Sequence, residues 1–254
     1  MSSHSLTQDE QLSRFLRPQS RQGKLFLRAP SGYASWQAWL SGKVLPLAVF
    51  TLFLVTNGLL LPNEAIQLVS EGVRLYPLMA FMRHSFMLGF LLLIMAAYLT
   101  RTHAVARARG FRERIFPLLV LFATIVGMSF LRHVEASQRL DLITMGLLLT
   151  VLGYYISLWA LWYLRGSFAI MAEARSPIIS GPYWYVRHPL YLGEMLSMLG
   201  LCLAIGTVTA LLFWIAITGM QLVRARIEEA KLANQFDDYR TYRERTRFIL
   251  PGLF

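Results

Sequence analysis

The feature that most constrains this chain is a set of apolar segments long enough to cross a membrane as helices. A helix needs roughly 20 mostly apolar residues to span about 30 Å of hydrocarbon. Four segments have this character: Val44 to Leu61, Tyr76 to Leu99, Ile115 to Leu131 and Leu142 to Leu164. Only 15% of the 254 residues are charged, whereas a soluble domain has about a quarter. The sequence therefore predicts an all-α polytopic membrane protein.

A fifth apolar stretch, Leu190 to Met220, is too long for a single span. Its 31 residues would make about 46 Å of helix at a rise of about 1.5 Å per residue. Gly206 and Thr207 interrupt it near the middle, so we expect a helical hairpin. Its first helix, Pro189 to Ala204, is short and would tilt or thin the bilayer. Its second continues as an amphipathic extension to about Asn234, which gives about six transmembrane helices.

The distribution of cations indicates how the chain is oriented. Six spans place both termini on one side, and 21 of the 25 Lys and Arg residues fall on that side. By the positive-inside tendency, both termini are expected to be cytoplasmic. Because the cations alternate with spans, the formal net charge of +11 does not point to a nucleic-acid partner. Cys202 is the only cysteine, and no metal-ligand spacing occurs, so we expect neither a disulfide scaffold nor a bound metal.

Three regions follow from this pattern. Residues 1–43 form a cytoplasmic N-terminal segment, which is either an interfacial helix or an unstructured tail. Residues 44–164 hold four transmembrane helices, and the first of these is expected to act as an uncleaved insertion signal. Residues 165–254 hold the hairpin and its extension. The Arg-rich chain lacks an N-glycosylation sequon, which favours a bacterial inner membrane over the endoplasmic reticulum.

Polar residues gather at the cytoplasmic side of the last two helices. The connection before the fifth span holds Glu173 and Arg175, followed by the stretch from Ser180 to Pro189. The extension of the sixth helix holds the pair Glu228 and Glu229. Because the two helices form a hairpin, the start of one and the end of the other should emerge together. A site built between them would be half cytosolic and half embedded in the membrane.

Three ionisable residues lie inside predicted spans, namely Glu194 in the fifth and Arg83 and His84 in the second. A charge within the bilayer is costly, so such residues usually serve a site or face a partner. We therefore expect Glu194 to belong to a site. Arg83 and His84 either lie near the interface or pair with Glu194.

An ordered set of motif residues runs through the last 90 residues or so. It reads Gly181-Pro182-Tyr183-x-Tyr185-x-Arg187-His188-Pro189-x-Tyr191-x-Gly193, then Glu228-Glu229-x-x-Leu232-x-x-x-Phe236, then Tyr239-x-x-Tyr242 and a late Leu250-Pro251. This set resembles the isoprenylcysteine carboxyl methyltransferase family of integral membrane methyltransferases. One departure is that Phe236 is followed directly by Asp237, where the family often has Phe-Gly. The front half carries no such resemblance.

The resemblance implies S-adenosylmethionine as methyl donor, held in a cytosolic pocket capped by the C-terminal segment. It also implies a lipophilic acceptor that enters from the bilayer, with membrane lipids as neighbours. The first four helices, which lie outside the resemblance, are a candidate lining for the acceptor's tunnel. By motif position, His188 and Arg187 lie at the donor carboxylate and the mouth of the site. The other positions expected to contact the cofactor are Tyr185, Pro189, Tyr191, Glu228, Glu229 and Tyr239.

The residue types suit this chemistry independently. The donor has a carboxylate that needs a cation, ribose hydroxyls that need an acceptor, and an adenine that needs an aromatic or apolar slot. Methyl transfer is an in-line displacement at carbon, so alignment and desolvation should matter most. A carboxylate acceptor needs no base and could be held by Arg245. An amine, thiol or hydroxyl needs one, and Glu194 or Glu173 is the candidate. The expected catalytic residues are thus Arg187, Glu194 and Arg245.

Other interpretations remain open at this point. Glu228 and Glu229 also suit a solvated helix face, and Arg187 suits a membrane anchor. A membrane reductase of the sterol-reductase kind has a similar C-terminal arrangement but uses NADPH. A small transporter or scaffold could use the intramembrane Arg83, His84 and Glu194 without any chemistry.

Overall fold

A computed structural model of the chain describes residues 44–59, 61–70, 75–100, 104, 106, 108–131, 139–164 and 166–249. Within these residues every regular element is a helix, accompanied by two isolated β-bridges. The predicted all-α fold is confirmed for this part of the chain. The interfacial helix considered for residues 1–43 lies outside it.

The helices follow the apolar segments of the sequence. In chain order they are α3 (Leu45–Gly58), α4 (Leu61–Ser70), α5 (Leu75–Thr100), the π-helical turn η2 (Phe111–Ile115), α6 (Phe116–Leu131), α7 (Leu140–Leu164), the 3-10 turn η3 (Gly181–Trp184), α8 (Pro189–Ile205), α9 (Val208–Gln235) and α10 (Asp237–Arg245). Four helical stretches are long and apolar enough to cross a membrane: Pro46–Ser70, Phe81–Thr100, Leu140–Leu164 and Val208–Gln235. Helices α6 and α8, with 16 and 17 residues, are shorter. The six-span count therefore stays a prediction.

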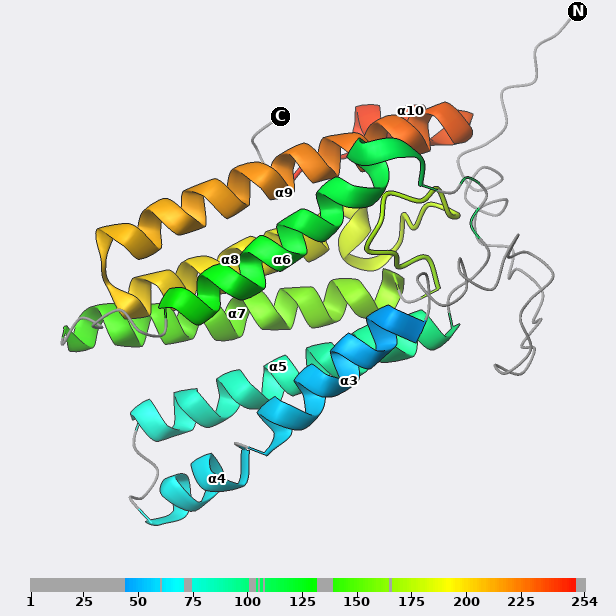
Figure 1. The fold of residues 1–254 in the computed structure, drawn as a ribbon. Coiled ribbons are helices and arrows are strands. Elements are labelled where there is room, and N and C mark those ends of the chain that lie inside the picture. The colour runs from blue at the N-terminus through cyan, green and yellow to red at the C-terminus, as the bar shows by residue number, and fades with distance from the viewer. Residues whose placement is uncertain are drawn as a thin grey trace, which may run out of the picture.

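The helices pack side by side in an order that differs from their order in the chain (Figure 1). Helix α7 lies between α5 and α8, α3 and α4 pack on α5, and α6 packs on α9. Large apolar side chains such as Leu52, Phe122, Leu148 and Leu212 are exposed along the outer faces of these helices. So much apolar surface is unfavourable in water and suits surrounding lipid.

The predicted hairpin is confirmed as α8 and α9. Gly206 ends α8 in the left-handed conformation with φ of 70°, which glycine adopts without a steric penalty. The Thr207 side chain then accepts a hydrogen bond from the Ala210 amide and caps α9. The two helices extend only one residue beyond the predicted ends, to Ile205 and Gln235.

Small residues hold α7 close to α8. Gly153 on α7 faces Gly193 and Ser197 on α8, and Gly146 faces Gly200 one layer further along. A Cβ atom at any of these glycines would overlap backbone atoms of the other helix. Such close backbone approach is a common way for helices to associate in membranes. It fixes the start of α8, and with it the motif residues that precede it.

The first predicted span is longer in the structure than in the sequence analysis. The sequence predicts an end at Leu61, but the helical stretch continues through α4. Its Glu64 is accommodated because Glu64 Oε1 lies 2.6 Å from His84 Nδ1 on α5 and 3.9 Å from Arg83. Arg83 and His84 therefore pair with Glu64. The alternative prediction, that they pair with Glu194, is wrong.

Candidate active site

The candidate site lies at the end of the bundle where α8 begins and α9 extends beyond it (Figure 1). The 3-10 turn η3 starts at Gly181, whose φ of 63° is left-handed, and Pro189 begins α8 at a position where its missing N–H costs no hydrogen bond. The chain after α10 returns beside this motif. The amides of Arg187 and His188 donate to the carbonyls of Arg247 and Phe248 at 2.8 and 3.2 Å. The motif and the C-terminal segment are therefore joined by backbone hydrogen bonds.

Arg187, His188 and Glu229 form a buried charged cluster. Arg187 Nε donates to Glu229 Oε1 at 2.5 Å, and His188 Nε2 lies 3.3 Å from the same oxygen. The Glu229 side chain is only 2% exposed. Arg187 Nη1 also donates to the main-chain carbonyls of Arg243 and Thr246. Because a buried charge is tolerated only when paired, this cluster holds α8, α9 and the C-terminal segment together.

Tyr191, Arg224 and Glu228 form a second cluster one turn away. The Tyr191 hydroxyl donates to Glu228 Oε1 at 2.5 Å, and Arg224 Nε donates to the same oxygen at 3.2 Å. Arg224 also donates to the Ile170 carbonyl at 2.9 Å and lies over the Tyr191 ring. Glu228 is 22% exposed, so the two adjacent glutamates have different partners and different access to ligands.

A cavity of about 110 Å³, here called the inner cavity, lies between these clusters, the connection after α7 and helix α10. Among the predicted site residues, those that line it are Arg187, His188, Tyr191, Glu228 and Tyr239, together with Glu173, one of the two candidate bases. Residues that the sequence analysis left without a role also line it, namely Arg175, Tyr183 and Tyr242. The walls thus combine charged and aromatic groups.

Burial raises the pKa of the Tyr183, Tyr239 and Tyr242 phenols above the ordinary value of 10.0. Desolvation is the main cause, because it penalises the charged phenolate. The three hydroxyls stay protonated at neutral pH and remain available as donors. That of Tyr242 donates to the Tyr183 carbonyl at 2.5 Å, which connects α10 to η3.

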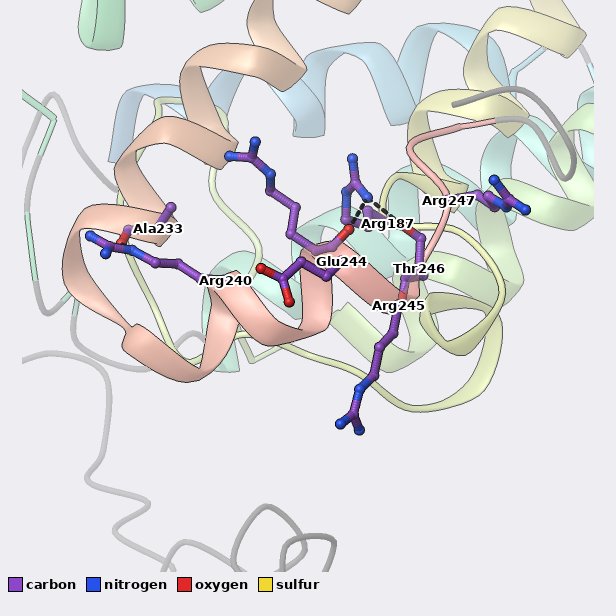
Figure 2. Close-up of a pocket in the computed structure, with 8 residues that line it drawn as sticks. Arg187, Ala233, Arg240, Glu244, Arg245, Thr246 and Arg247 are labelled. Atoms are coloured by element: carbon purple, nitrogen blue, oxygen red, sulfur yellow. Dashed lines mark hydrogen bonds between the residues drawn. The ribbon is translucent and has the colours of Figure 1, made fainter. Parts of the chain in front are cut away.

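Arg187 also lines a larger cavity of about 640 Å³, here called the outer cavity (Figure 2). Its residues are Arg187, Ala233, Arg240, Arg243, Glu244, Arg245, Thr246 and Arg247. Arg245 lines this cavity and is not among the residues of the inner one. Figure 2 shows its side chain pointing away from Arg187. The structure therefore does not bring Arg245 together with Tyr191 and Glu228.

The remaining predicted site residues lie near the inner cavity without lining it. Glu194 is half-buried inside the hairpin, where Glu194 Oε2 accepts a hydrogen bond from Gln221 of α9 at 2.8 Å. Tyr185 is 66% exposed. Pro189 is buried at the start of α8, and Glu229 lies behind Arg187 and His188. Their expected contacts with a ligand stay predictions.

Arg175 is the residue of the inner cavity that sequence reasoning missed most clearly. It is 5% exposed and donates through one terminal nitrogen to Glu173 Oε2 at 2.6 Å. Its Nε and Nη1 atoms, and the Tyr183 hydroxyl, are buried without a hydrogen-bond partner among the described residues. In the sequence Arg175 looks like one of the many cations of the predicted cytoplasmic side. The only feature that could have pointed to a role in the site is its position six residues before Gly181, where the motif begins.

A third set of contacts holds the loops at this end of the bundle together. The Lys231 ammonium of α9 donates to Glu113 of η2, and the Arg109 amide donates to the same carboxylate at 2.7 Å. The Ala172 amide also donates to the Glu113 carbonyl at 2.9 Å. Burial alone would raise the pKa of Glu113, but the contacts with Lys231 and Arg109 outweigh it and lower the pKa below its ordinary 4.5.

Comparison with known proteins places this site within a recognised pattern. Residues 142–239, from α7 to the first turn of α10, match the family described as phospholipid methyltransferase. The cobalt-zinc-cadmium resistance protein CzcN of Cupriavidus metallidurans is 33% identical over 117 residues, 44% of this chain and 50% of that protein. The nickel-cobalt-cadmium resistance protein NccN of Alcaligenes xylosoxydans xylosoxydans is 28% identical over 141 residues, 55% of this chain and 63% of that protein.

The matches to the two relatives cover only part of this chain and only part of each relative. The matched part of each relative is between half and two thirds of its length. The family match leaves out α3 to α6 but includes the α8–α9 hairpin and both charged clusters. The C-terminal part of the chain, residues 142–239, thus carries the sequence pattern of the phospholipid methyltransferase family, which confirms the predicted resemblance to integral membrane methyltransferases in this region.

Proposed function

We propose that this protein transfers a methyl group from S-adenosylmethionine to a lipid-like acceptor at the membrane surface. The observation that supports this most strongly is the inner cavity, which lies within the region that matches the family. It offers charged groups for the polar parts of the donor and aromatic walls for its adenine. Sites for small molecules commonly combine apolar walls with a few placed polar groups in this way.

The proposal assigns residues of the inner cavity to the separate groups of the donor. Glu228 is partly exposed and can accept hydrogen bonds from ribose hydroxyls, while the tyrosines provide rings and neutral hydroxyls. When bound, S-adenosylmethionine supplies an electrophilic methyl carbon on a sulfonium. Tyr183, Tyr239 and Tyr242 line the cavity, and their rings would shield a bound donor from water. Exclusion of water and fixed alignment are the main ways to accelerate such a displacement.

The acceptor is proposed to reach the cavity from the bilayer. Leu164 at the end of α7 and Leu190 at the start of α8 line the inner cavity on its apolar side. A lipid-like molecule could therefore place a nucleophilic head group beside the donor while its tail stays in the membrane. A carboxylate head group would give a methyl ester. We propose that the site lies on the cytoplasmic side of a bacterial inner membrane. The charge distribution and the bacterial relatives both support this location.

Ligand protection in detergent tests the choice of donor. Heating the purified protein with and without S-adenosylmethionine should show a rise in Tm that depends on ligand concentration, because a ligand that binds the folded state stabilises it. Glu228→Gln should lose most of this rise. Asp141→Asn, at the exposed start of α7, is the matched control and should keep it. Protection of the wild type by NADPH and not by S-adenosylmethionine would contradict the proposal and indicate a reductase.

A further inference from the structure

Arg175 is a buried arginine whose hydrogen-bonding capacity is mostly unused. A guanidinium carries five N–H groups, and the contact with Glu173 Oε2 engages one terminal nitrogen. The Nε and Nη1 atoms have no partner in the part of the chain that the structure describes. Since leaving charged donors unsatisfied in a protein interior is costly, an arginine of this kind is best explained by an anionic group that it binds.

The other arginine on the inner cavity is already engaged. Arg187 donates to Glu229 and to the carbonyls of Arg243 and Thr246. The Arg224 guanidinium beside the cavity is held in the same way, by Glu228 and the Ile170 carbonyl. Arg175 therefore has more unused donors than either of these arginines.

Arg175 and Glu173 also form a pair of opposite charges on one wall. Both residues line the inner cavity, and Arg175 Nη2 lies 2.6 Å from Glu173 Oε2. A zwitterionic amino-acid group carries the complementary pair, a carboxylate and an ammonium. The buried Tyr183 hydroxyl on the same cavity is a further donor without a partner among the described residues.

We infer that Arg175 binds the carboxylate of the methionyl group of the methyl donor, with Glu173 facing its ammonium. This rests on the proposed function. It moves the carboxylate-binding role expected of Arg187 and His188 to Arg175, and it leaves Arg187 to hold the C-terminal segment. Arg175 is thereby a binding residue for one end of the donor, while Glu228 serves the other.

Two ligands separate the donor's amino-acid group from the rest of the molecule. S-adenosylmethionine carries that group, whereas 5′-methylthioadenosine has the adenosine and sulfur without it. We expect Arg175→Gln to weaken S-adenosylmethionine binding in isothermal titration by about 10- to 100-fold, as for loss of a hydrogen bond between charged groups. Its affinity for 5′-methylthioadenosine should stay within about two-fold of wild type, and this also shows that the variant is folded.

Arg139→Gln is the matched control, because Arg139 pairs with an acidic residue two positions away at an exposed site. It should leave both affinities unchanged. Equal losses of both ligands in Arg175→Gln would overturn the inference, since Arg175 would then support the cavity as a whole. Unchanged binding of S-adenosylmethionine would also overturn it and would assign Arg175 to an acceptor anion or to no ligand. Wild-type protein that binds neither ligand would instead refute the proposed function.

Discussion

The two adjacent glutamates of α9 show how neighbouring residues of one motif acquire different roles. Successive helix positions point about 100° apart, so Glu228 and Glu229 cannot share a set of partners. Glu229 is buried against Arg187, and Glu228 is partly exposed beside Tyr191. The motif predicts which residues meet at the site. It cannot predict which of them bind each other, because those partners come from segments about 40 residues apart in the chain.

Glu229→Gln should therefore act mainly on stability. It removes the charge that compensates Arg187 and leaves that guanidinium buried, which typically costs about 3 to 5 kcal/mol. We expect a clear fall in Tm, measured by thermal unfolding in detergent without ligand. Glu244→Gln on α10 is the control and should unfold close to wild type, because Glu244 is exposed. A Glu229→Gln variant of unchanged Tm would contradict the structural role.

At the scale of elements, the sequence predicts the hairpin well because its signals are local. A glycine and a threonine in sequence are enough to end one helix and begin the next. The continuation of the first span through α4 has no such signal, since Glu64 is accommodated by His84 on a different helix. Contacts between distant segments, like those that build the inner cavity, are similarly hidden from periodicity and spacing.

The contact between α7 and α8 gives a test at this scale. Gly153→Leu should push the helices apart, because a side chain there would overlap the α8 backbone. Overpacking of this kind costs about 1 to 3 kcal/mol or more, and it should lower both Tm and donor affinity, since α8 carries the motif. Gly219→Leu in α9 is the matched control, with open space around its Cβ position. Equal behaviour of the two variants would argue against close α7–α8 packing.

The tie between η2 and α9 predicts a dependence on pH. Because the folded pKa of Glu113 is lowered, its contribution to stability is present above the unfolded value near 4.5 and is lost as the pH falls through the folded value. Lys231→Met removes the partner. The difference in Tm between wild type and Lys231→Met should be constant near neutral pH and shrink below about pH 4.5. A difference that grows on acidification would contradict this assignment.

At the scale of the whole molecule, the site lies at one end of the helices, and the structure gathers five arginines around the outer cavity there. The sequence predicts that 21 of the 25 Lys and Arg residues fall on one side of the membrane. The family match begins in α7 and does not include helices α3 to α6. The front helices are therefore the part whose contribution, proposed as an acceptor path, has least support from sequence.

The most direct measurement of the central claim is methyl transfer itself. Purified protein would be incubated with S-adenosylmethionine labelled in its methyl group and with total membrane lipid, and the lipid fraction would then be extracted and counted. The account predicts label in that fraction with wild type and Asp141→Asn, and at least about 10-fold less with Glu228→Gln. Wild-type protein that binds S-adenosylmethionine yet puts no label into lipid would contradict it.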